Sequence, residues 1–252
     1  MQKLYEYFPD LTKKQYEQIE TLCDLYTYWN EKINVISRKD IENIFEHHVL
    51  HSMAIAKFFE FKQGSKILDV GTGGGLPGIP LAILFPKVQF TLIDRIAKKI
   101  TVANNIINEL GLTNVTARQQ TVEENKEKYD YIVSRAVTAF PDFYKLVKKN
   151  VSSIVNNSLC NGIIYIKGGD FYEEMQGFKK YKILPISAYF TEPFFETKKI
   201  IYLPKEAVKD PNSVKLLKAD GSIVTVGDIR NKNHVEYSER KNINKLEPNK
   251  DA

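Results

Sequence analysis

A glycine-rich run in the first third of the chain is the stretch best suited to chemistry. An apolar segment leads through Asp69 into Gly-Thr-Gly-Gly-Gly at 71–75, and an apolar helical pattern begins at Gly78. Glycines between a strand and a helix let the backbone approach a ligand closely, and they direct the amides of the helix N-terminus at polar or anionic groups. The sequence therefore predicts a binding loop for a nucleotide-like cofactor.

The spacing within this loop bears on which cofactor it holds. The dinucleotide fingerprint is Gly-x-Gly-x-x-Gly. Gly71 and Gly73 occupy its first two positions, but Leu76 stands at the third. The carboxylate of Asp69 suits a cationic group better than a pyrophosphate, and S-adenosylmethionine carries an ammonium and a sulfonium but no phosphate. The loop favours S-adenosylmethionine and leaves NAD as the alternative.

Asp94 is the second acidic residue that could meet a cofactor. It ends the apolar segment 89–94, one strand–helix unit after the loop. A carboxylate at this position can accept hydrogen bonds from two ribose hydroxyls, in NAD and S-adenosylmethionine alike. The alternative is a helix N-cap. Position alone does not separate the two roles.

The elements around these residues alternate between strand and helix patterns, which predicts an α/β fold with a parallel sheet and crossover helices. A closing pair of strands is expected to be antiparallel. The expected strands are 67–70, 89–94, 114–118, 130–134, 162–167, 183–190 and 198–204, and the expected helices between them are 78–85, 96–110 and 143–150.

The two ends of the chain differ from this pattern. Residues 1–60 read as a helical extension: Thr12 and Gln15 have capping-box spacing before a helix to residue 29, and Ser37 could cap a second helix. Residues 61–204 form the expected α/β domain. Residues 205–252 predict a hairpin that turns at Asp220-Gly221, followed by a mobile polar tail.

Composition and charge restrict the class of protein. The 252 residues carry a net charge of +5, which permits nucleic-acid binding without requiring it. No apolar run approaches a membrane span, and the N-terminus lacks a signal pattern. Cys23 and Cys160 fit neither a zinc pattern nor a disulfide framework, so we expect two buried thiols in a reducing compartment. We expect a cytoplasmic protein without membrane association.

Three histidines raise the question of a metal. His47 and His51 are four residues apart, as zinc ligands on a helix can be. No glutamate follows His47 as the metalloprotease motif requires, and no third ligand is evident. The sequence predicts no metal, and the histidines are interpreted as packing or hydrogen-bonding groups.

Four stretches carry a resemblance to a known family: WNEKINVISRKD, HHVLHS, ILDVGTGGGLPGIPLAILFP with FTLID, and YIVSRAV. Over roughly residues 25–204 the chain resembles the bacterial small-subunit ribosomal RNA guanine-N7 methyltransferases, also called glucose-inhibited division protein B. The resemblance implies a Rossmann-like class I methyltransferase with a helical N-terminal extension. It also implies S-adenosylmethionine as methyl donor and a guanine N7 of 16S ribosomal RNA, or of the small subunit, as acceptor.

Individual site residues follow from this resemblance. It implies cofactor contacts at Gly71, Leu76, Val122, Glu123 and Arg135, and it makes Arg135 the candidate catalytic residue. Analogy with methyltransferases in general adds Asp69 and Asp94, and the glycine pattern adds Gly73. His48 matches a family histidine, whereas His51 stands where the family often has an aspartate.

RNA contacts are expected at His48, Lys98 and Lys167, although a solvated lysine or a packing histidine is the alternative at each. Guanine N7 has a free lone pair, so we expect no general base. The chain is expected to act as a monomer. The competing functions are a methyltransferase with a small-molecule or protein acceptor, an NAD-dependent oxidoreductase, and a ribosome-binding module without activity.

Overall fold

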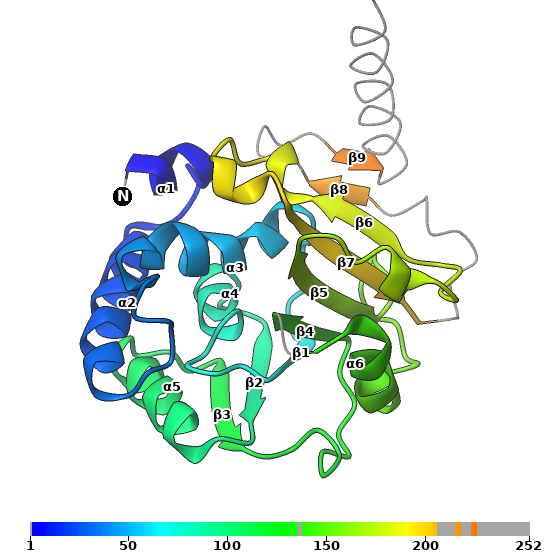
Figure 1. Ribbon diagram of the computed structural model, residues 1–252, viewed down its shortest axis with the longest axis horizontal. Coiled ribbons are helices and arrows are strands. Elements are labelled where there is room, and N and C mark those ends of the chain that lie inside the picture. The colour runs from blue at the N-terminus through cyan, green and yellow to red at the C-terminus, as the bar shows by residue number, and fades with distance from the viewer. Residues whose placement is uncertain (1, 136–137, 206–214, 218–222, 226–252) are drawn as a thin grey trace, which may run out of the picture.

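The computed structural model describes residues 2–135, 138–205, 215–217 and 223–225. Its centre is a twisted sheet of seven strands with helices on both faces (Figure 1). The strand order is β3-β2-β1-β4-β5-β7-β6. The strands are β1 (Lys66–Val70), β2 (Gln89–Asp94), β3 (Val115–Gln119), β4 (Tyr131–Arg135), β5 (Gly162–Gly168), β6 (Lys182–Pro185) and β7 (Lys198–Pro204).

The first five strands are parallel, and the last two complete the sheet in antiparallel pairs. β7 runs antiparallel to both β5 and β6. From β1 the chain proceeds to β2 and β3 on one side, and from β4 to β5 on the other. The predicted α/β fold is therefore confirmed. Ligands of such sheets bind where the strand order reverses, which here lies between β1 and β4.

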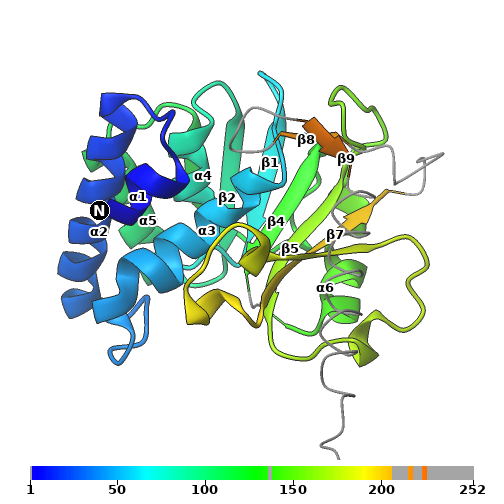
Figure 2. The same ribbon diagram turned by 90° about the horizontal axis from the view of Figure 1, so that it is seen from above.

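Alternating side chains build a separate apolar core on each face of the sheet. In β1, Ile67 belongs to the core beneath α4 and α5, and Leu68 belongs to the core beneath α6. Figure 2 shows α6 apart from the helices of the other face. The helices are α4 (Gly78–Leu84), α5 (Ala97–Glu109) and α6 (Phe140–Val147), with short 3₁₀ turns at Lys148–Asn150, Glu173–Met175 and Pro193–Phe195.

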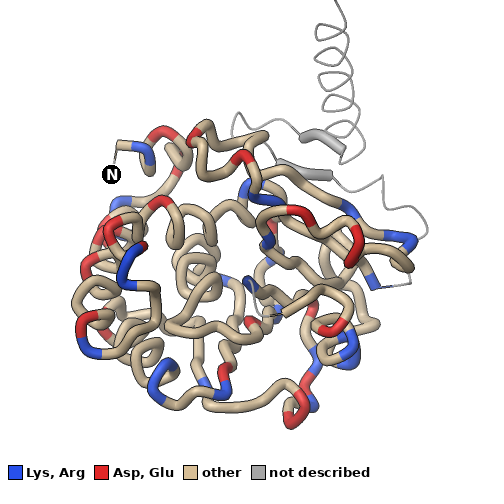
Figure 3. The backbone as a smooth tube through the Cα atoms, viewed as in Figure 1, with Lys and Arg blue, Asp and Glu red and all other residues tan. Residues whose placement is uncertain are grey.

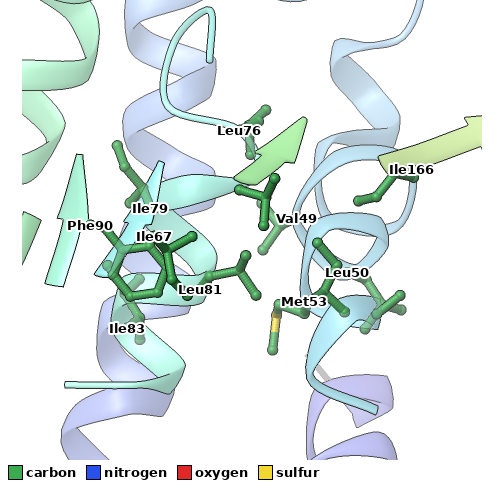
Figure 4. Close-up of a cluster of buried hydrophobic side chains, with 14 of the residues drawn as sticks. Val49, Leu50, Met53, Ile67, Leu76, Ile79, Leu81, Ile83, Phe90 and Ile166 are labelled. Atoms are coloured by element: carbon green, nitrogen blue, oxygen red, sulfur yellow. The ribbon is translucent and has the colours of Figure 1, made fainter. Parts of the chain in front are cut away.

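The N-terminal extension covers the α4 face. It comprises α1 (Gln2–Tyr7), α2 (Lys13–Lys32), a 3₁₀ turn (Ile41–Asn43), a π-helical segment (Ile44–Leu50), α3 (His51–Met53) and a 3₁₀ turn (Ala54–Lys57). Figure 4 shows Val49, Leu50 and Met53 of this extension near Leu81 of α4. Burying such side chains contributes about 1.5–3 kcal/mol each, so the extension is part of the folded core.

The two expected helix starts of the extension have different outcomes. The capping box is confirmed, because Thr12 Oγ1 accepts from the Gln15 amide at 3.3 Å and Gln15 Oε1 accepts from the Thr12 amide at 2.9 Å. The cap at Ser37 is wrong. The second helical stretch begins after Asp40, which forms no side-chain cap because its carboxylate contacts two histidines instead.

Differences at the C-terminal side have local causes. The expected strand 183–190 ends at Pro185, which has no amide to donate, and the chain then turns through Ile186–Ala188. β8 (Lys215–Leu217) and β9 (Ile223–Thr225) form the antiparallel arms of the expected hairpin. Its turn at 220–221 and the tail lie outside the described residues. Cys23 and Cys160 are free but half-buried, not buried as expected.

Candidate functional site

A cleft of about 670 Å³ lies at the carboxyl ends of β1, β2 and β4. That volume is within the range of small-ligand sites. Its lining comes from the glycine loop, the starts of the β2–α5 and β3–β4 connections, and α6. The structure brings together seven of the predicted site residues here, namely Gly71, Gly73, Leu76, Asp94, Val122, Glu123 and Arg135.

The glycine loop has a backbone that side chains with a Cβ rarely adopt. Gly71, Gly73 and Gly75 have φ values of 69°, 59° and 110°. A Cβ on Gly75 would lie 2.3 Å from Cδ1 of Ile79, whereas a Cβ on Gly73 would meet only a lysine side chain at 4.0 Å. Gly75 is thus required by packing against α4, and Gly71 and Gly73 shape the wall of the cleft.

Asp69 supports the loop from beneath and does not line the cleft. Its Oδ2 accepts from Thr72 Oγ1 at 2.6 Å and from the Gly78 amide at 2.9 Å. Its Oδ1 is buried and has no partner. Burial raises the pKa of this carboxyl to about 7. An unpartnered buried oxygen next to a cleft fits a cationic ligand group, which would favour the ionised form.

Asp94 joins the loop to α5 through both carboxylate oxygens. Oδ2 accepts from the Gly73 amide and Oδ1 from the Ile96 amide, each at 2.9 Å. It is not a helix cap, because Ile96 occupies the N-cap position of α5 and no side chain caps that helix. Each carboxylate oxygen retains a second lone pair. Asp94 can therefore accept from ligand hydroxyls while it holds the loop.

Arg135 ends β4 and reaches the N-terminal extension. Its Nη1 donates to the carbonyls of His47 and His48, at 3.4 Å each, and its Nη2 contacts Nδ1 of His48 at 3.1 Å. Nε2 of His48 lies 2.7 Å from Oδ2 of Asp40. Since arginine only donates, Nδ1 accepts and Nε2 carries the proton. The chain Asp40–His48–Arg135 ties the extension to the cleft.

His48 is neutral in this chain. Burial and the neighbouring Arg135 lower the pKa of its imidazole to about 4, despite the opposing effect of Asp40. Both ring nitrogens are occupied by protein groups, so an RNA contact through them would require the chain to open. The predicted RNA contact at His48 stays a prediction.

The two predicted RNA-binding lysines lie outside the cleft. Lys98 is exposed on α5, whereas its neighbour Lys99 lines the cleft. Lys167 at the end of β5 donates to both carboxylate oxygens of Glu174. That ion pair offsets its charge, and Glu174 also accepts from the amide of Phe140 at the start of α6. Lys167 therefore orders the edge of the site, and RNA contacts by either lysine remain predictions.

His51 is buried against Phe194 and Phe195, and its Nε2 has no partner. Burial keeps its pKa well below the usual range. It packs in the neutral form, in agreement with the interpretation as a packing histidine. Within residues 2–135, 138–205 and the two hairpin strands, no group of three or more His, Cys, Asp or Glu is placed to hold a metal.

Tyr26 is a site residue that sequence reasoning did not identify. It is fully buried on α2, and its hydroxyl donates to the carbonyl of Gly74 at 3.1 Å. Nearby, Asn30 Oδ1 accepts from the amides of Val35 and Ile36, at 2.9 Å each, and so shapes the segment that covers the loop. A tyrosine on the apolar face of a helix gives no signal of such a polar contact.

Replacing Tyr26 with phenylalanine should loosen the glycine loop without opening a cavity. The Gly74 carbonyl loses its donor, so the free energy of unfolding should fall by about 1–1.5 kcal/mol and cofactor affinity should fall a few-fold. Chemical denaturation and calorimetric titration measure the two effects. Tyr28→Phe, on the exposed side of the same helix, is the matched control. Equal effects of the two variants would contradict this role for Tyr26.

Comparisons with known proteins identify the family. A family model described as rRNA small subunit methyltransferase G (GidB) matches residues 15–187. The chain belongs to this family. Ribosomal RNA small subunit methyltransferase G of Bacteroides thetaiotaomicron is 53% identical over 203 residues, which cover 80% of this chain and 98% of that protein. The Flavobacterium johnsoniae protein of the same name is 51% identical over 204 residues, which cover 81% and 98%.

Family membership confirms the resemblance inferred from the four sequence stretches. The protein is a methyltransferase that acts on small-subunit ribosomal RNA. S-adenosylmethionine is the methyl donor. The Rossmann-like assignment also agrees with the observed strand order. In the part of the chain that the structure describes, no helix is both long and apolar enough to cross a membrane.

Proposed function

We propose that this protein methylates N7 of a guanine in 16S ribosomal RNA, as a cytoplasmic monomer without a metal. In this proposal residues 61–204 form the methyltransferase domain, 1–60 its helical extension and 205–252 a C-terminal extension. The supporting observation is that His48, the imidazole beside the cleft, has both ring nitrogens engaged and is neutral. The described residues that line the cleft include no histidine, and this suits an acceptor that needs no deprotonation, such as guanine N7.

The residues around the cleft fit the donor. S-adenosylmethionine, when bound, supplies a methyl group on a sulfonium sulfur that leaves with the bonding electron pair. Gly71 and Gly73 would allow its close approach to the backbone, and Asp94 would accept hydrogen bonds from its ribose hydroxyls. Leu76 and Val122 provide apolar walls, because both side chains are buried at the cleft. The carboxylate of Asp69 offsets positive charge from beneath the loop.

Catalysis then rests on position. The lone pair of N7 would attack the methyl carbon, so a rate gain would come from the residues that hold donor and acceptor in alignment. Arg135 is the charged residue of β4 at the cleft, and its contacts with the backbone of the extension fix its guanidinium there. It is placed to position the methionine end of the donor, the target base or a phosphate.

Methyl transfer from labelled S-adenosylmethionine to small ribosomal subunits that lack this modification tests the proposal. Chemical cleavage at 7-methylguanine maps the product. We expect a single cleavage in 16S ribosomal RNA, and the free RNA and assembly intermediates serve as alternative acceptors in parallel. Label in RNA without cleavage at a guanine, or label only in protein or small molecules, would contradict guanine N7 as the acceptor.

A further inference from the structure

A second hollow, a groove of about 820 Å³, lies on the α6 face of the sheet. Its floor is formed by the start of β5 and the end of β7, at Ile163 and Leu203. Because the cofactor cleft lies at the carboxyl ends of the parallel strands, this groove is at the opposite end of the sheet. Its walls are the end of α6 and the turn before β6. Figure 3 shows Lys and Arg segments near α6 and at that turn.

The charged side chains that line this groove are all positive. Its lining holds five lysines and no aspartate or glutamate: Lys148, Lys149, Lys179, Lys180 and Lys205. Within the described residues, none of the five forms an ion pair. Lys149 and Lys205 donate to the carbonyls of Glu123 and Val151 at 2.7 and 2.6 Å, which orders them without neutralising their charge. Lys148, Lys149, Lys179 and Lys180 are exposed.

Two aromatic rings lie among these ammonium groups. Tyr144 and Phe178 are half-buried and meet edge to face, with ring centroids 5.2 Å apart. Nζ of Lys148 lies 5.5 Å from the centroid of Tyr144. Sites for single-stranded nucleic acid usually combine two features. Lysines contact the phosphate backbone of the nucleic acid, and aromatic rings stack on its bases. An acidic peptide would use the charge but not the rings.

We propose that this lysine groove binds the phosphates of a single-stranded segment of the substrate RNA, away from the methylated nucleotide. The groove and the cofactor cleft flank α6, whose eight residues are about 12 Å long. Glu123 connects them, because it lines the cleft and its carbonyl accepts from Lys149. One folded RNA can therefore contact both. That the RNA is 16S ribosomal RNA rests on the proposed function.

A charge-matched pair of triple variants tests the groove. Lys148→Ala/Lys179→Ala/Lys180→Ala removes three of the four exposed charges of the groove and leaves Lys149, and Lys13→Ala/Lys14→Ala/Lys62→Ala removes three exposed charges elsewhere. Filter binding of full-length 16S RNA transcript is measured from 0.05 to 0.5 M salt. For three lost phosphate contacts, we expect the negative slope of log affinity against log salt to become less steep by about 2. Affinity near 0.15 M salt should fall roughly 10- to 50-fold.

The control triple variant should stay within about twofold of the wild type under these conditions. In the groove variant, cofactor affinity and the rate at saturating RNA should be unchanged, while KM rises. Equal losses in both variants would overturn the proposal, because net charge alone would explain them. Displacement of the RNA by poly-glutamate as readily as by poly(U) of equal length would also overturn it, in favour of an acidic protein partner.

The outcomes separate the groove from the proposed function. If the groove variant loses 16S RNA affinity relative to the control variant but the wild type transfers no methyl group to a guanine, the groove stands and guanine N7 is wrong. If transfer maps to one guanine while the groove variant binds and turns over like the wild type, the proposed function stands and the groove is wrong.

Discussion

Arg135→Ala should lower kcat/KM for methyl transfer to the small subunit by roughly 100- to 1,000-fold, the usual cost of removing one preorganised donor from an active site. Arg135 is the charged residue that β4 contributes to the cleft, and alanine there removes the guanidinium that positions donor or acceptor. Arg135→Lys should recover only part of the loss, because an ammonium cannot reproduce the planar fork that contacts two carbonyls and an imidazole.

The same substitution should also reduce stability. The carbonyls of His47 and His48 and the Nδ1 atom of His48 all lose their donor, at a cost of about 1–3 kcal/mol. Arg135 therefore has a second role, which is to tie the extension to the sheet. Activity must therefore be compared at a temperature where denaturation curves show the variant to be folded.

Asp40→Asn separates the two roles of Arg135. It keeps the guanidinium but weakens the contacts of Asp40 with His47 and His48, at 2.6 and 2.7 Å. If Arg135 acts directly at the cleft, this variant should lose stability and keep most of its transfer rate. Near-normal transfer by folded Arg135→Ala would remove Arg135 from the site, and equal rate losses in both variants would make it a positioning residue only.

The sheet and the loop could be predicted from the sequence because their signals are local. Apolar strand patterns recur with helices between them, and Gly71, Gly73 and Gly75 all have the positive φ that only glycine adopts readily. The left-handed end of α5 was likewise predictable from Gly111, with a φ of 61°. Each of these features is determined by residues that are neighbours in the chain.

The polar contacts of the site could not be predicted in this way. Tyr26 reaches Gly74 across 48 positions and Arg135 reaches His48 across 87, and periodicity does not specify a partner at such a distance. Ser37 failed as a cap for a different reason: the Asp40 amide donates to the carbonyl of Ser37 in a turn, and the helical stretch begins only after Asp40. Lys167 reads as a free cation in sequence, and only the fold shows Glu174 beside it.

The cofactor affinity of the wild type should depend on pH through Asp69. Burial raises the pKa of this carboxyl to about 7, so in the free protein it is largely protonated below that pH. The positive donor favours the ionised form, and binding below pH 7 must therefore first remove a proton. Affinity should be roughly tenfold weaker at pH 6 than at pH 8, because one proton is released per binding event. Calorimetric titration across pH 5.5–8.5 measures this.

Asp69→Asn is the control, because it keeps the shape of the side chain and removes the charge. Its affinity should be weak and independent of pH across the same range. The pH dependence of the unfolding free energy is a second, independent measure of the protonation of Asp69. Between about pH 4 and 7 the folded protein holds a proton on Asp69 that the unfolded chain has released. The wild type should therefore lose up to about 1.4 kcal/mol of unfolding free energy per pH unit as pH rises, relative to the variant.

The two measurements must agree for the interpretation to hold. If the wild type shows the relative loss of stability but both proteins bind the cofactor with the same pH dependence, Asp69 is a buried acid that supports the loop and does not sense the donor. If neither differs from the variant, the carboxyl is not protonated near pH 7, and its unpartnered Oδ1 is hydrogen-bonded in solution. Only a change in both would make the buried charge of Asp69 part of cofactor recognition.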